Sequence, residues 1–219
     1  MVEFQLRRRG IRDEAVLAAM SAVPRELFVP PELSELAYAD EALPIEEGQT
    51  ISQPWIVARM SELLEVRQGM PVLEVGTGSG YQTAVLAAMG CRVVSVERHA
   101  ALAEVARARL AGLGLEASVR IEVGDGSRGW PADAPFEGII VTAAAPSVPG
   151  ALRDQLSDGG RLVIPVGRRD RQDLVQVVRS DSEFRTRDHG PCVFVPLVGA
   201  EAFPEGGGRP RSWRNRLRS

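Results

Sequence analysis

Apolar residues along the chain follow two patterns, short continuous runs and longer stretches with helical spacing. The run Val72 to Val75 is typical of a strand buried on both faces of a parallel sheet. Similar runs predict strands over residues 92–97, 119–123, 138–142, 161–166, 174–179 and 192–198. Apolar residues that recur every three or four positions predict helices over 11–22, from 54, from about 80, and over 100–112 and 148–156.

The order of these elements predicts an α/β fold. Strands and helices alternate through the middle of the chain, as in a doubly wound, mostly parallel sheet. The last two predicted strands, 174–179 and 192–198, are separated by a polar turn and not by a helix. They therefore predict an antiparallel pair that closes the C-terminal edge of the sheet.

Two segments stand apart from this alternation. Residues 42–54 have no helical periodicity, and a loop of this length within a compact domain is usually functional. Residues 203–219 are rich in glycine, proline and arginine. We expect one domain over residues 1–202, beginning with a helical segment, and a disordered tail after it.

Composition narrows the class of protein. The 219 residues, 44% hydrophobic and 25% charged, are typical of one globular domain, and a net charge of −3 gives no general reason to expect a nucleic-acid partner. No apolar run approaches the about 20 residues that span a bilayer, and no secretory signal begins the chain. Cys91 and Cys192 lack metal or redox spacing, so we expect reduced thiols, no metal and a cytoplasmic protein.

A glycine-rich turn follows the strand at 72–75. Gly76, Gly78 and Gly80 allow unusual backbone angles and let a ligand lie against the main chain, beside the free N–H groups of a helix start. A dinucleotide fingerprint has its third glycine one residue later, where the turn faces a pyrophosphate. The spacing here therefore favours a different ligand.

Two acids indicate what that ligand is. Glu74, just before the turn, suits a ligand with an ammonium group, and Glu97, 21 positions after Gly76 at the end of the second strand, is placed to bind ribose hydroxyls. Ammonium and ribose together indicate S-adenosylmethionine (SAM) and not NAD. The alternative is a tight βα turn with no ligand, flanked by solvated acids.

Several motifs resemble the protein-L-isoaspartate O-methyltransferase family. The segment Thr50-Ile51-Ser52-Gln53-Pro54 is specific to that family, whereas the glycine turn is shared by most SAM methyltransferases. Further matches are Val23–Glu26 with Phe28-Val29, Val72–Thr83, Ala134–Phe136 with Ile139–Ala144, Leu162–Gly167 and Phe194–Leu197. The resemblance runs from about residue 8 to residue 198 and implies a Rossmann-like SAM-dependent methyltransferase fold.

The resemblance also implies an activity. The family moves a methyl group from SAM to the α-carboxylate of L-isoaspartyl residues in damaged proteins and peptides, leaving S-adenosyl-L-homocysteine. By position, Ser52 corresponds to the active-site serine and Val195, Pro196 and Leu197 to a substrate-binding strand. The expected SAM contacts are Thr50, Ile51, Glu74, Gly76, Thr77, Gly78, Glu97, Asp125 and Gly126. Val193 stands where the family often has arginine.

Local physics offers other roles for two of these residues. Ser52 lies where a serine could cap the helix that begins at Pro54, and Asp125 between glycines could be only a turn former. A carboxylate with a pKa near 4 is already ionised at neutral pH, so methylation of an isoaspartyl residue needs orientation more than a base. This agrees with a chain whose two histidines, His99 and His189, stand beside no evident nucleophile.

Two alternatives remain open. One is a SAM methyltransferase that acts on nucleic acid or a small molecule, although residues 142–146 carry no Asn/Asp-Pro-Pro-Tyr motif and no cysteine. The other is a non-catalytic SAM-binding protein, which would have no reason to keep residues 50–54. We expect a monomer that acts on isoaspartyl proteins and peptides, with no nucleic-acid or membrane partner.

Overall fold

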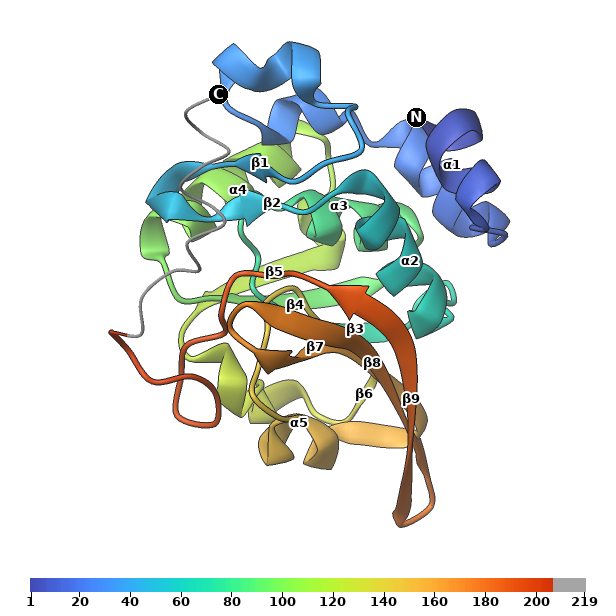
Figure 1. The fold of residues 1–219 in the computed structure, drawn as a ribbon, viewed down its shortest axis with the longest axis vertical. Helices are drawn as coiled ribbons and strands as arrows, with labels where there is room; N and C mark the ends of the chain where they lie inside the picture. Colours follow the sequence, from blue (N-terminus) through green and yellow to red (C-terminus); the bar gives the residue numbers. More distant parts are fainter. Residues whose placement is uncertain (207–219) are drawn as a thin grey trace.

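The alternating apolar runs form one seven-stranded sheet in a computed structural model, which describes residues 1–206 (Figure 1). The strands lie in the order β5-β4-β3-β6-β7-β8-β9, with the first five parallel, β8 antiparallel to β7, and β9 antiparallel to β8. Their bounds are β3 Pro71–Val75, β4 Arg92–Glu97, β5 Val119–Val123, β6 Phe136–Val141, β7 Leu156–Arg168, β8 Arg171–Ser180 and β9 Glu183–Cys192. The predicted fold class is therefore confirmed.

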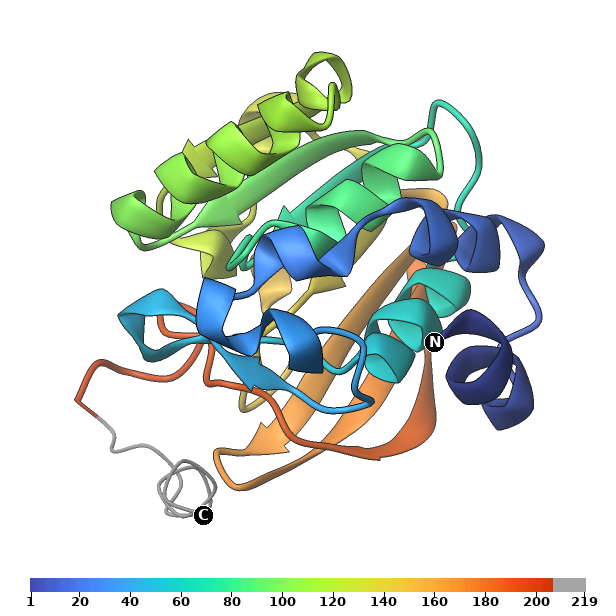
Figure 2. The same ribbon diagram turned by 90° about the horizontal axis from the view of Figure 1, so that it is seen from above.

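Helices cover both faces of this sheet. Their bounds are α1 Glu14–Ala22, α2 Pro54–Leu64, α3 Tyr81–Ala88, α4 Ala100–Gly112 and α5 Gly150–Asp154. Helices α1 to α4 lie on one face, and α5 lies on the other (Figures 1 and 2). Side chains of β3 alternate between these faces, so that Val72 packs with α2 while Leu73 and Val75 pack in the cluster that contains Leu152 of α5.

The segment between α1 and α2 carries short turns and a small hairpin. Two 3-10 turns, Arg25–Phe28 and Pro31–Leu36, lead to β1 Leu43–Pro44 and β2 Thr50–Ile51, which pair antiparallel. Part of the predicted loop at 42–54 is therefore a two-stranded hairpin. Pro54 is the first residue of α2, as predicted.

The C-terminal strands differ from the prediction. Residues 183–191, interpreted as part of the polar turn, form β9 together with Cys192. The rest of the predicted strand at 192–198 follows β9 as an extended segment that bridges Ala144 through Pro196. Strand β9 is an edge strand that is mostly exposed, so it has no apolar alternation to reveal it. Figure 1 shows the β8–β9 hairpin reaching beyond the rest of the sheet.

One further boundary was wrong. The predicted helix at 148–156 is limited to α5, because residues from Leu156 onward, including Asp158-Gly159-Gly160, already belong to β7. The disordered tail from residue 203 stays a prediction; its first residue, Phe203, bridges Val198 and lies 4.6 Å from the Arg169 guanidinium. Residues 207–219 of that tail lie outside the described residues.

No helix within residues 1–206 has the length and apolar character that a membrane span requires.

Candidate active site

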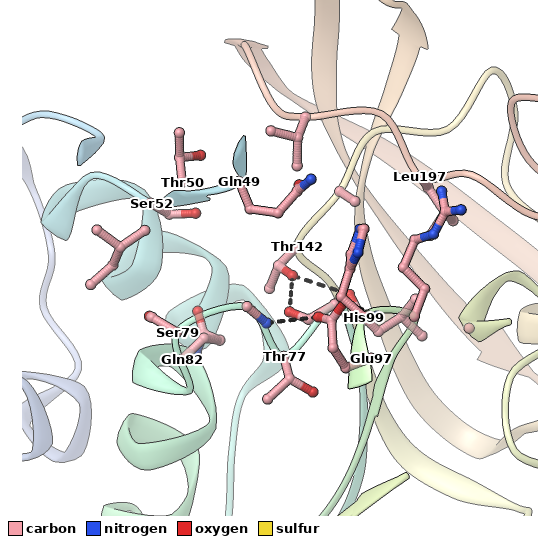
Figure 3. A pocket seen from close by; sticks show the side chains of 18 of the residues that line it. Gln49, Thr50, Ser52, Thr77, Ser79, Gln82, Glu97, His99, Thr142 and Leu197 are labelled. Atoms are coloured by element: carbon pink, nitrogen blue, oxygen red, sulfur yellow. Dashed lines mark hydrogen bonds between the residues drawn. The ribbon is translucent and has the colours of Figure 1, made fainter. Parts of the chain in front are cut away.

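A cavity of about 340 Å³ opens where the carboxyl ends of β3, β4 and β6 face the β1–β2 hairpin and the segment after β9 (Figure 3). Pockets at this end of an open parallel sheet are the usual ligand sites of such folds. The predicted site residues that line it are Thr50, Ile51, Ser52, Gly76, Thr77, Gly78, Glu97, Gly126, Val195, Pro196 and Leu197. Glu74 and Asp125 do not line this cavity.

The glycine turn needs glycine for two physical reasons. Gly76, Gly78 and Gly80 have φ angles of 96°, 53° and 89°, in the left-handed region that other residues rarely adopt. A Cβ atom on Gly76 would also stand 2.5 Å from the hydroxyl oxygen of Thr142. The bare backbone of the turn therefore forms one wall of the cavity, as the sequence predicted.

Glu97 ends β4 and is held from both sides by the backbone. The side chain, in a residue only 4% exposed, accepts hydrogen bonds from the N–H of Gly78 at 2.9 Å and from the N–H of His99 at 3.0 Å. A carboxylate has about four lone-pair positions, so two remain for donors inside the cavity. This arrangement suits a pair of neighbouring hydroxyl groups, such as those of a ribose.

Glu74 lies behind the glycine turn instead of in the cavity. It is fully buried and accepts hydrogen bonds from the hydroxyls of Thr83 and Ser95, while its Oε1 has no hydrogen-bond partner within residues 1–206. Ser95 in turn lies 2.6 Å from the hydroxyl of Thr77 in the turn. Burial raises the pKa of Glu74 to about 7. The expected direct contact with a ligand ammonium is therefore not offered, because position 74 of β3 faces α3 and β4.

Asp125 is also occupied by its own chain. Its carboxylate accepts the N–H and the hydroxyl of Ser127 and the N–H of Ala200, and it borders a small recess beside the main cavity. Burial opposes its ionisation, but these N–H and hydroxyl donors together lower its pKa. The turn-forming role that the sequence left open is thus present, and the carboxylate fastens the segment after β9 to the end of β5.

Ser52 follows β2 and lies at the opposite side of the cavity from Glu97 (Figure 3). The N-cap residue of α2 is Gln53, and among the described residues no side-chain hydrogen bond caps the start of that helix. Within residues 1–206 the Ser52 hydroxyl has no hydrogen-bond partner, while the Ser52 carbonyl accepts a bond from Arg25 at 2.8 Å. The helix-cap interpretation of Ser52 is therefore wrong, and the hydroxyl is available to a ligand.

The segment after β9 forms the third wall. Its backbone at Val195 and Leu197 exchanges hydrogen bonds with Ala144, at 2.8 and 2.7 Å, which fixes the segment beside β6. Val193, which stands where the family often has arginine, is 53% exposed and is not part of the cavity lining.

Several lining residues were given no firm role from the sequence. His99, Gln49, Gln82 and Thr142 all face the cavity (Figure 3). His99 stands 3.6 Å from Glu47 at the rim, and the Gln82 amide donates to the hydroxyl of Ser61 at 2.9 Å. Only the position of His99, two residues after Glu97 at the end of β4, gave a sequence signal, because β-strand ends in this fold meet the ligand.

Comparisons with known proteins agree with this geometry. The family model described as Protein-L-isoaspartate(D-aspartate) O-methyltransferase matches residues 1–202. Curated relatives named protein-L-isoaspartate O-methyltransferase include those of Methylorubrum populi, 59% identical over 90% of this chain and 93% of the relative, and of Methanoculleus marisnigri, 55% identical over 91% and 90%.

Solved structures give the same result. One named protein-L-isoaspartate O-methyltransferase superimposes with a TM-score of 0.78 at 30% identity, and the match covers 90% of this chain but 64% of that one. A second, described as a putative protein-L-isoaspartate O-methyltransferase from Plasmodium falciparum in complex with S-adenosyl-L-homocysteine, has a TM-score of 0.76 at 25% identity, covering 88% and 94%.

Proposed function

Because the chain belongs to the protein-L-isoaspartate(D-aspartate) O-methyltransferase family, we propose that its cavity joins a SAM site to a site for an isoaspartyl carboxylate. The enzyme is a SAM-dependent protein-repair methyltransferase, which methylates the α-carboxylate of L-isoaspartyl residues. The observation that carries the assignment of the residues is the placement of Ser52 and Glu97 on opposite walls of one cavity.

The wall formed by β3 and β4 holds the cofactor. Gly76, Thr77 and Gly78 present bare backbone, and Glu97 has lone pairs left for ribose hydroxyls. Gly126 lies farther along the same edge, at the nucleoside end. When bound, SAM supplies an electrophilic methyl group on its sulfonium sulfur. Thr50 and Ile51 cover this wall from the hairpin.

The opposite wall holds the substrate. The Ser52 hydroxyl, without a partner in the described chain, donates a hydrogen bond to the isoaspartyl carboxylate and fixes its direction. The extended segment Val195–Leu197 lies alongside the peptide. Both contacts orient a carboxylate that is already ionised. Orienting two bound groups for transfer lowers a large part of the activation barrier.

No side chain has to remove a proton in this reaction. A carboxylate with a pKa near 4 is a competent nucleophile throughout the neutral range. His99 reaches the cavity but pairs with Glu47 at the rim, which fits a role in closing the nucleoside end. The residues of the cavity therefore bind, align and exclude water.

The test is methyl transfer from labelled SAM to an isoaspartyl peptide, with the aspartyl peptide of the same sequence as control. Ser52→Ala should lower turnover at least about tenfold while SAM affinity stays within about threefold, because only a substrate contact is removed. Ser34→Ala, at an exposed position outside the cavity, is the matched control. Equal labelling of both peptides by the wild-type protein would contradict the proposed substrate.

The biological setting follows from the same proposal. Isoaspartyl residues arise in many proteins, so the partners are damaged proteins and peptides bound one at a time by a monomer. Reduced, buried Cys91 and a net charge of −3 favour a cytoplasmic enzyme without a nucleic-acid partner. Light scattering of the purified protein tests the monomer, and fractionation of cells tests the location.

A further inference from the structure

One buried charge outside the cavity lining has no role in the function described above. Arg25 is completely buried, yet it forms no ion pair within residues 1–206. Its Nε donates to the carbonyl of Ala37 at 2.7 Å, and its Nη2 donates to the carbonyl of Ser52 at 2.8 Å. The guanidinium carbon lies 4.7 Å from the centre of the Tyr81 ring.

This placement is costly for a charged group. Burying a cation without a carboxylate partner is unfavourable, and here burial lowers the pKa of Arg25 to about 10. Nη1 has no partner among the described atoms. An apolar residue would fill the space at lower cost, so the two bonds to Ala37 and Ser52 need another explanation. The planar guanidinium of Arg25 has several N–H donors in a rigid arrangement, so it holds the carbonyls of Ala37 and Ser52 at a fixed distance and direction from each other. Neither lysine nor an apolar residue can do this.

The two carbonyls belong to segments that meet beside the cavity. The segment from Ala37 to Asp40 also contacts the start of α2, where the Gln53 amide donates to the Asp40 carbonyl at 2.8 Å and the Trp55 N–H donates to the Asp40 carboxylate at 3.3 Å. Those two hydrogen bonds hold residues 53 and 55. Among the hydrogen bonds described here, only the one from Arg25 holds the backbone of Ser52.

Arg25 also reaches the cofactor wall. Tyr81 directly follows the last glycine of the turn and lines the cavity, and its ring faces the guanidinium. Arg25 therefore touches the residue that carries the substrate-binding hydroxyl and a residue that follows the cofactor-binding turn. Arg25 itself is not one of the residues that line the cavity.

We propose that Arg25 is a positioning residue for methyl transfer, which holds the Ser52 backbone so that the Ser52 hydroxyl stays aligned with the cofactor wall. The inference rests on the proposed role of Ser52 in substrate binding. It predicts an effect on the peptide step and little effect on SAM binding, since the Arg25 hydrogen bonds go to residues 37 and 52 and not to the glycine turn.

The experiment is a double-mutant cycle. Four proteins are compared: wild type, Arg25→Met, Ser52→Ala and the double variant. For each, kcat and KM are measured with an isoaspartyl peptide at saturating SAM, SAM affinity is measured by calorimetry, and folding is checked by thermal denaturation. Arg25→Met should lower kcat/KM for the peptide by about tenfold or more, because small misplacements of a reacting group carry costs of this size. SAM affinity should stay within about threefold.

The cycle separates positioning from general support of the fold. If Arg25 acts through Ser52, then Arg25→Met should cost less than about threefold in the Ser52→Ala background, since contacting groups in one network are not additive. Arg9→Met is the matched control, because Arg9 pairs with Asp40 and stacks on the Trp55 ring at 4.3 Å without contacting Ser52. This control should leave peptide kinetics within about twofold of wild type.

Each outcome is decisive. A loss of tenfold that persists unchanged in the Ser52→Ala background, or a loss confined to SAM affinity, would overturn the inference and leave the proposed function intact. A Ser52→Ala enzyme that turns over like wild type would overturn both the Ser52 assignment and the inference. Where Arg25→Met does not fold, the same cycle is run with Arg25→Lys, which keeps the charge but places its donors on one nitrogen in place of the guanidinium fork, and which should show the same coupling.

Discussion

Removal of the Glu97 carboxylate should weaken SAM binding more than any other single change to the cofactor wall. The Glu97→Ala variant deletes the carboxylate of a residue that is only 4% exposed and that already accepts hydrogen bonds from the N–H groups of Gly78 and His99. Without the carboxylate, the N–H groups of Gly78 and His99 lose their hydrogen-bond acceptor, and the ribose hydroxyls of SAM lose the same acceptor.

The magnitude follows from the remaining lone pairs. Two of the four positions on the carboxylate serve the backbone, so two hydrogen bonds to ribose hydroxyls are lost. Hydrogen bonds to charged groups contribute about 1.5–3 kcal/mol each, and part of this is recovered when water enters the cavity. A net cost of about 2–3 kcal/mol is expected, which corresponds to a Kd for SAM about 30- to 150-fold higher.

The assay is calorimetric titration of the purified variant with SAM, and again with S-adenosyl-L-homocysteine. Glu47→Ala is the matched control, because Glu47 is a more exposed acid at the cavity rim that pairs with His99, and this variant should bind SAM within about threefold of wild type. Unchanged SAM affinity in folded Glu97→Ala would show that the carboxylate does not bind the ribose, and would remove Glu97 from the cofactor site.

Three further predictions concern the turn and the chemistry. Burial raises the pKa of Glu74 from 4.5 to about 7, so its contribution to stability is full below pH 4.5 and is lost as the pH rises through 7. Neutral Glu74→Gln should therefore gain about 2–3 kcal/mol relative to wild type between pH 5 and 8, measured by urea unfolding; an equal difference at both pH values would contradict this. Gly76→Ala should weaken SAM binding and destabilise the fold by about 1–2 kcal/mol or more, because its φ is 96° and the new Cβ would clash with the Thr142 hydroxyl. Gly112→Ala is the control and should have neither effect, because the space around Gly112 is open. Single-turnover methyl transfer at saturating SAM should change less than about twofold from pH 6 to 8; a unit-slope rise that His99→Ala abolishes would show that a base is required.

Local sequence determined much of the fold and one wall of the site. Buried parallel strands such as β3, which is apolar except for Glu74, are short runs of apolar residues. The glycines at 76 and 78 occupy backbone angles that other residues avoid, so both features can be recognised from a few neighbouring residues. Glu97 was predicted because the end of a second parallel strand always reaches the same edge of the sheet. Ser52 required more than local physics, since local physics favoured a helix cap and only the family resemblance favoured the active site.

Contacts between distant segments decided the rest. The orientation of Glu74 depends on hydroxyls of Thr83 and Ser95 that only the packed α3 and β4 bring to it. Asp125 fastens Ala200, 75 positions away, instead of facing the cavity. Strand β9 could not be recognised because an exposed edge strand forms through hydrogen bonds to a neighbour and needs no apolar pattern of its own. A buried polar group takes whichever partners the tertiary fold places beside it, and those partners are far away along the chain.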